Sequence, residues 1–68
     1  MGNLIIEALL ISAQLLANGK ELTLDEFHQV RNSEYARGIE NGEWTDSDEN
    51  FELFDKTLSN NLKVVWNS

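Results

Sequence analysis

The sequence of 68 residues contains no cysteine, no proline and one histidine, and its five basic residues are outnumbered by twelve acidic ones. Without cysteine the chain can form neither a disulfide nor a thiolate metal site. A single histidine cannot build an imidazole cluster, and we expect no bound metal and no cofactor. A domain of this size buries only about 60% of its unfolded surface, so close packing or association with another chain has to stabilise it.

The formal net charge of −7 disfavours binding to nucleic acid or to anionic membranes, because phosphate groups are bound by an excess of Lys and Arg. An acidic surface is instead compatible with a basic protein partner. The absence of cysteine fits a reducing compartment, and we expect a cytoplasmic protein. The hydrophobic content of 41% is ordinary for a folded protein and argues against global disorder, and the length predicts a single domain over residues 1–68.

The most apolar stretch, LIIEALLISAQLLA, covers residues 4–17. On a helix the polar residues in and beside this stretch, apart from Ser12, share one narrow stripe. The apolar arc that remains is more than twice as wide as the arc of about 100° on a typical surface helix. We predict a helix over 3–18, ended by Asn18-Gly19, that needs neighbours on three sides. Ser12 lies outside the polar stripe and can be buried by bonding to a carbonyl one turn earlier. The stretch is too short to span a membrane, and no basic residue precedes it as in a signal peptide.

A second helix is predicted over 24–41. Thr23 and Glu26 have the spacing of a capping box, in which each side chain bonds the backbone amide of the other residue. Leu22 and Phe27 flank this cap at the positions of a hydrophobic staple. Asn41-Gly42 provides the same C-terminal stop as Asn18-Gly19.

A third helix is predicted over 46–66, because apolar residues recur there at intervals of three and four. Asn60-Asn61 is the weak point of this helix, since asparagine is a poor helix former. The alternative is a short strand over 62–66 that pairs with a strand over 21–24. The sequence therefore predicts an all-α domain of three helices, with the strand pair left open.

Two segments have part of the spacing of a calcium-binding loop. Residues 18–27 resemble the second half of an EF-hand loop, but residues 14–17, where the first carboxylates belong, are all uncharged. Asp46-Ser47-Asp48 begins like such a loop, yet Phe51 stands where a glycine has to turn and Thr57 where the closing glutamate belongs. Neither segment predicts a metal site.

No pattern of catalytic residues is present. His28 is expected on the surface of the second helix, and Ser33 lies five residues away, which places the two on different sides of a helix. No phosphate loop or glycine-flanked serine occurs. We expect a protein that is not an enzyme.

The acidic segment from Glu40 to Asp55 holds no basic residue before Lys56. Its carboxylates offer a surface for a basic, nucleic-acid-binding protein, and we expect the chain to be a small regulator or inhibitor of such a partner. In size and charge alone it is similar to phage anti-restriction and anti-CRISPR inhibitors. The expected partner-binding residues are Glu40, Glu43, Asp46, Asp48, Glu49, Glu52 and Asp55.

Two other functions remain open. The first is a homodimeric assembly domain, because two further helices are too few to cover the apolar first helix, and either Leu10 or Ile11 should stay uncovered in a monomer. The second is a divergent helix-turn-helix DNA-binding regulator, which the acidic second helix disfavours. The expected dimer interface consists of Leu4, Ile5, Leu9, Leu10 and Ile11.

Overall fold

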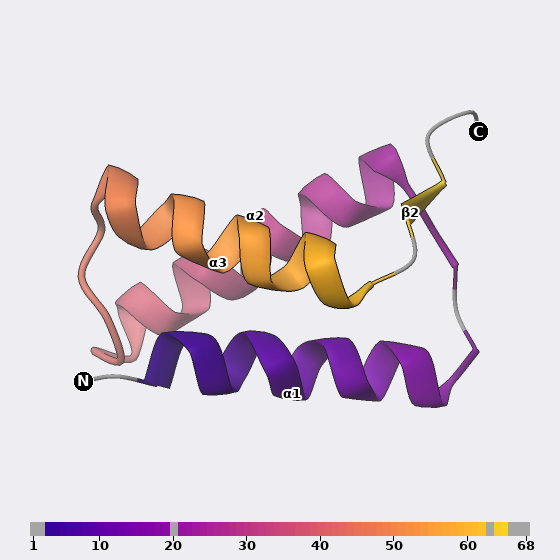
Figure 1. Cartoon of the computed structure of the whole chain (residues 1–68). Helices are drawn as coiled ribbons and strands as arrows, with labels where there is room; N and C mark the ends of the chain where they lie inside the picture. The colour runs from indigo at the N-terminus through magenta and orange to yellow at the C-terminus, as the bar shows by residue number, and fades with distance from the viewer. Residues whose placement is uncertain (1–2, 20, 63, 66–68) are drawn as a thin grey trace.

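The computed structural model describes residues 3–19, 21–62 and 64–65, and it confirms a mainly helical fold with three helices (Figure 1). The helices α1 and α3 pack side by side and run in the same direction, while α2 runs back behind them. In chain order the elements are α1 (Asn3–Ala17), β1 (Leu22–Thr23), α2 (Leu24–Glu40), α3 (Asp48–Asn61) and β2 (Val64–Val65).

The ends of α1 and α2 follow the predicted local chemistry. The hydroxyl of Thr23 accepts a hydrogen bond from the amide of Glu26 at 3.2 Å, and the Glu26 carboxylate accepts one from the amide of Thr23 at 3.0 Å, which completes the capping box. Gly19 and Gly42 take positive φ angles of 66° and 75° just after the two helices. A side chain would be strained there, so glycine is the residue that lets each helix stop.

The third helix ends earlier than predicted. It runs to Asn61 instead of residue 66, and Leu62 is already extended with φ −113° and ψ 154°. The Asn61 amide donates to the Thr57 carbonyl at 2.8 Å, and such side-chain bonds to the backbone favour helix ends. Val64 then pairs in parallel with Leu22, so the alternative strand pair is the correct one over 22–23 and 64–65. Positions 63 and 66 lie outside the described residues.

The core lies where α1 and α3 meet the β1 segment. Phe54 and Leu58 of α3, Ala8 of α1 and Leu22 of β1 are almost completely buried. The staple residue Phe27 belongs to the same cluster, so the start of α2 is fixed to the core through the residues on either side of its cap. Burial on this scale stabilises a small domain by about 1.5–3 kcal/mol for each large apolar side chain.

Aromatic side chains fix the loop between α2 and α3. Tyr35 packs edge-on against Phe51 with ring centroids 5.1 Å apart, and Trp44 lies 5.4 Å from Phe54. The indole Nε1 of Trp44 donates to the Tyr35 carbonyl at 3.2 Å. Because Trp44 is only 8% exposed, the loop between α2 and α3 contributes a side chain to the core.

Candidate functional site: an exposed apolar face on α1

The main surface feature of the described chain is an apolar face of α1 that no other element covers. Five large aliphatic side chains on it expose 45–57% of their surface. Ala13 lies among them and is exposed as well. We call this surface the outer face of α1, made of Ile5, Ile6, Leu9, Leu10, Ala13 and Leu16.

Helix geometry explains why this face is free of polar groups. Leu4, Ala8 and Ser12, spaced by four residues, point into the core. The Ser12 hydroxyl donates to the Ala8 carbonyl at 2.8 Å, as predicted from the sequence. Ser12 is therefore buried with its hydroxyl hydrogen-bonded and does not lie on the outer face. The outer face then spans an arc of about 140° in which every residue is apolar.

The extent of this face is large for so small a protein. Its half-exposed side chains leave on the order of 400–500 Å² of apolar surface in solvent, about a tenth of the total of 4583 Å². Contiguous apolar patches of several hundred Å² on a monomer are often functional sites. Each half-exposed side chain also forgoes about 1 kcal/mol of burial. The face therefore favours association with another apolar surface.

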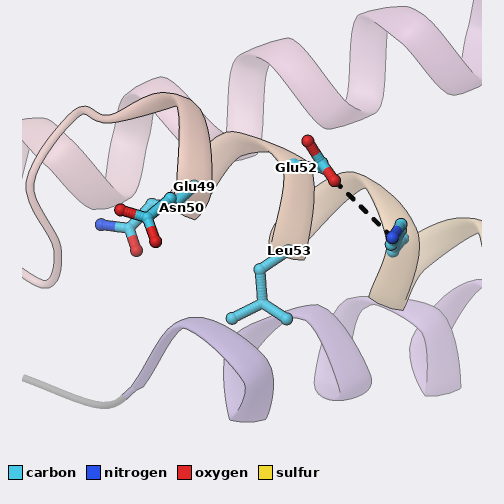
Figure 2. Close-up of a pocket in the computed structure, with 5 residues that line it drawn as sticks. Glu49, Asn50, Glu52 and Leu53 are labelled. Atoms are coloured by element: carbon cyan, nitrogen blue, oxygen red, sulfur yellow. Dashed lines mark ion pairs between the residues drawn. The ribbon is translucent and has the colours of Figure 1, made fainter.

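An open hollow of about 440 Å³ lies on α3 (Figure 2). Leu53 lines it, is 41% exposed and points toward α1. Glu49 and Glu52 also line the hollow, and the Nζ of Lys56 lies 3.6 Å from a carboxylate oxygen of Glu52. The hollow is thus lined by polar and charged side chains together with the single apolar residue Leu53.

A second groove, of about 440 Å³, lies between α1 and α2. Leu10 lines it and so borders both the groove and the outer face. The guanidinium of Arg37 pairs with Glu34 and lies 3.9 Å from a carboxylate oxygen of Glu7. The Glu34 carboxylate raises the pKa of Arg37 above its ordinary value. Glu7 therefore lines the groove toward α2 and does not lie on the outer face.

The predicted acidic residues fall into two groups. Asp55 pairs with Arg31 at 3.0 Å, Asp46 accepts a hydrogen bond from the Tyr35 hydroxyl at 3.1 Å, and Glu52 pairs with Lys56. Glu43 is half-buried. Of the predicted residues, Glu40, Asp48 and Glu49 are exposed and have neither an ion pair nor a side-chain hydrogen bond within the described residues.

The residues predicted for a dimer interface are also divided. Leu4 is 6% exposed and belongs to the core, and Ile11 is partly covered by it. Ile5, Leu9 and Leu10 lie on the outer face, so the expectation that either Leu10 or Ile11 stays uncovered is confirmed for Leu10. The sequence reasoning left out two half-exposed residues of the same face, Ile6 and Leu16. Their position on the helical wheel could have identified them once the buried side of α1 was known.

Groups that could perform chemistry are sparse. His28 is exposed, as predicted, and its ring lies 6.0 Å from that of Phe27. Among residues 3–19, 21–62 and 64–65, no three acidic or histidine side chains come together as a metal would require. None of the helices in this part of the chain is long and apolar enough to cross a membrane.

Comparisons with known proteins leave this geometry as the basis for interpretation. No protein-family model matches the chain. Neither a curated protein nor a solved structure matches it.

Proposed function

We propose that this protein is a non-enzymatic interaction domain that binds another protein chain through the outer face of α1. The observation that supports this most strongly is the row of half-exposed leucines and isoleucines on one uncharged side of a helix. Helices with such faces associate by burying them in an apolar groove or against another helix. The role that follows is that of a small regulator or inhibitor, or of an assembly domain, whose activity is binding.

A basic protein partner is the second candidate, and the hollow on α3 favours it. Glu49 and Glu52 stand beside Leu53, so a partner helix with an apolar side and flanking Lys or Arg residues would find complementary groups. Exposed carboxylates add specificity and speed of association more than affinity. In this candidate the partner is a basic, nucleic-acid-binding protein, and the chain blocks it in the manner of an inhibitor.

Direct DNA binding has less support. The two arginines of α2 are Arg31 and Arg37, and both already contact carboxylates of this chain. A recognition helix needs such side chains free for phosphate and base contacts. The groups exposed around them on α2 include Asp25 and Glu40, which repel a phosphate backbone.

The proposal is tested with two variants that each add one positive charge to an exposed position of α1. Leu9→Lys places the charge in the outer face, whereas Gln14→Lys places it beside the face as a matched control. Both should keep the helical circular dichroism of the wild type. We expect Leu9→Lys to lose association and Gln14→Lys to retain it. Association with a second copy is measured by sedimentation, and association with a different protein by affinity capture from a cell lysate. Equal association of both variants with either kind of partner would contradict the proposal.

A further inference from the structure

We infer that the outer face of α1 binds a second copy of this chain, with the two α1 helices antiparallel about a two-fold axis. This inference rests on the proposed function and names the partner. It follows from three features of the face: the spacing of its residues, the order of their sizes, and the distribution of charge around it.

The spacing is that of a coiled-coil seam. Ile6, Leu9, Ala13 and Leu16 are separated by three, four and three residues, and all four are exposed. Residues spaced in this way lie on one line along a helix and insert between the side chains of a facing helix. Leu10 borders the line on one side and widens the apolar contact beyond the seam.

The order of sizes along this line fits an antiparallel pair. In the register in which the numbers of facing residues add up to 22, Leu9 lies opposite Ala13 of the second copy, and Ile6 lies opposite Leu16. A large side chain then faces a small one at both central positions, which fills the contact and lets the helices approach closely. A parallel pair would instead place Ala13 opposite Ala13 and leave a void at the centre of the contact.

No charged side chain lies on the contact surface itself. Glu7 is the only ionisable side chain between residues 3 and 19, and it lines the groove toward α2 beside Arg37. Each copy nevertheless has a net charge of −7, so the two repel at longer range. Added salt screens that repulsion over about 8 Å at physiological ionic strength and should strengthen the dimer. Binding of a basic partner would weaken with salt, so the two occupants respond in opposite directions.

The available area is compatible with a dimer. Two copies that cover the exposed apolar side chains of each other would bury on the order of 800–1,000 Å² in total, which is at the low end for a protein interface and predicts a weak dimer that dissociates on dilution.

The test introduces single cysteines into the outer face, because the natural sequence contains none. Leu9→Cys and Ala13→Cys are prepared as separate variants that differ in mass through a tag, and each is equilibrated in a glutathione redox buffer alone and in a mixture. In the antiparallel register, Cys at 9 faces Cys at 13 of the second copy. Residue 9 of one copy and residue 9 of the second copy are offset by about 6 Å along the helix axis, and the same holds for the two copies of residue 13. The helix axes are also about 8–10 Å apart, so two identical cysteines lie beyond the reach of a disulfide.

We expect the mixture to form the disulfide-linked heterodimer as its main product, and each variant alone to remain largely reduced. Circular dichroism confirms that the variants fold, and Ile6→Cys with Leu16→Cys provides an independent pair with the same expected result. Efficient linking of Ala13→Cys to itself would overturn the antiparallel arrangement. No linking in either mixture, together with a monomeric wild type in sedimentation, would overturn the second copy as partner. In that event, loss of a captured foreign protein from Leu9→Lys would still support the proposed function.

Discussion

The indole ring of Trp44 occupies the space that a side chain at position 38 would need, so Gly38 is where the loop after α2 closes onto that helix. A Cβ at this position would overlap the ring of Trp44. The ring is buried and donates a hydrogen bond to the Tyr35 carbonyl, so it has little freedom to move. The contact is what permits a tryptophan in a loop to join the core.

Gly38→Ala should therefore destabilise the protein, although alanine is the better helix former by about 1 kcal/mol. Overlap with a packed ring costs typically about 1–3 kcal/mol, and we expect a net loss in the free energy of unfolding measured with urea. Ser33→Ala, at an exposed position of the same helix, serves as the control and should change this quantity by less than about 0.5 kcal/mol. A Gly38→Ala variant as stable as the wild type would show that Trp44 can be displaced freely.

Tyr35 should make stability depend on pH in the alkaline range. Its burial, and the neighbouring Asp46, raise the pKa of its hydroxyl above the ordinary value of 10.0. Because the folded protein holds this proton more tightly than the unfolded chain, the contribution is complete below pH 10 and is lost as the pH rises through the higher folded pKa. We expect the free energy of unfolding to fall more steeply above pH 10 in the wild type than in Tyr35→Phe. Identical slopes for the two proteins would contradict this assignment.

Tyr35→Phe also tests how α3 begins. The hydroxyl accepts a hydrogen bond from the amide of Ser47, which is the N-cap residue of α3, at 3.2 Å. The variant also removes the hydrogen bonds that the hydroxyl donates to Asp46 and to the Ser47 carbonyl, so at neutral pH we expect a total cost of about 1–2 kcal/mol, measured by thermal unfolding. An unchanged melting temperature would show that the cap is held by Ser47 alone.

Arg31 joins α2 to α3 in a way that lysine should not reproduce. Its guanidinium pairs with Asp55 at 3.0 Å and lies 4.8 Å from the ring centre of Phe51, and its side chain is only 16% exposed. Lysine lacks the planar group that both stacks and forms a directed pair. We expect Arg31→Lys to lower the free energy of unfolding by about 1–2 kcal/mol. Arg37→Lys is the matched control, since Arg37 is 54% exposed and its ion pairs should contribute less than about 1 kcal/mol. Equal effects would show that exposure does not distinguish the two arginines.

The acidic surface is tested by removing charge without removing bulk. Glu43→Gln, Glu49→Gln and Glu52→Gln are combined, and the fold should be unaffected because the only ion pair lost among the described residues is the exposed one with Lys56. If a basic partner binds there, its capture should weaken in the triple variant and with added salt. Capture that is insensitive to both changes would exclude an electrostatic partner. Tight binding of duplex DNA would instead favour the helix-turn-helix alternative.

Local sequence patterns predicted the helices well. The capping box of Thr23 and Glu26, the buried Ser12 and the glycine after each of the first two helices act over three or four residues, so the sequence alone determines them. The end of α3 was predicted wrongly because the apolar period continues past Asn61, whereas the pairing of Val64 with Leu22 depends on a segment 42 positions away. Periodicity cannot report such a distant partner.

The candidate site was predicted only in part for a similar reason. The apolar arc of α1 is so wide that the sequence does not say which side of it faces the core. The packing of α1 against α3 decides this: it buries Leu4 and leaves Ile6 and Leu16 exposed. Trp44 has no periodic neighbours in its loop, and its role depends on the absence of a side chain at Gly38. Both features require the tertiary arrangement.

The central claim is that the outer face of α1 is a surface for association with a second copy, and sedimentation equilibrium of the wild type at micromolar concentrations tests it most directly. We expect a mass of twice 7.8 kDa that falls toward the monomer on dilution, with Leu9→Lys folded and monomeric under the same conditions. A wild-type protein that remains a stable, folded monomer at every concentration and salt level would contradict the claim.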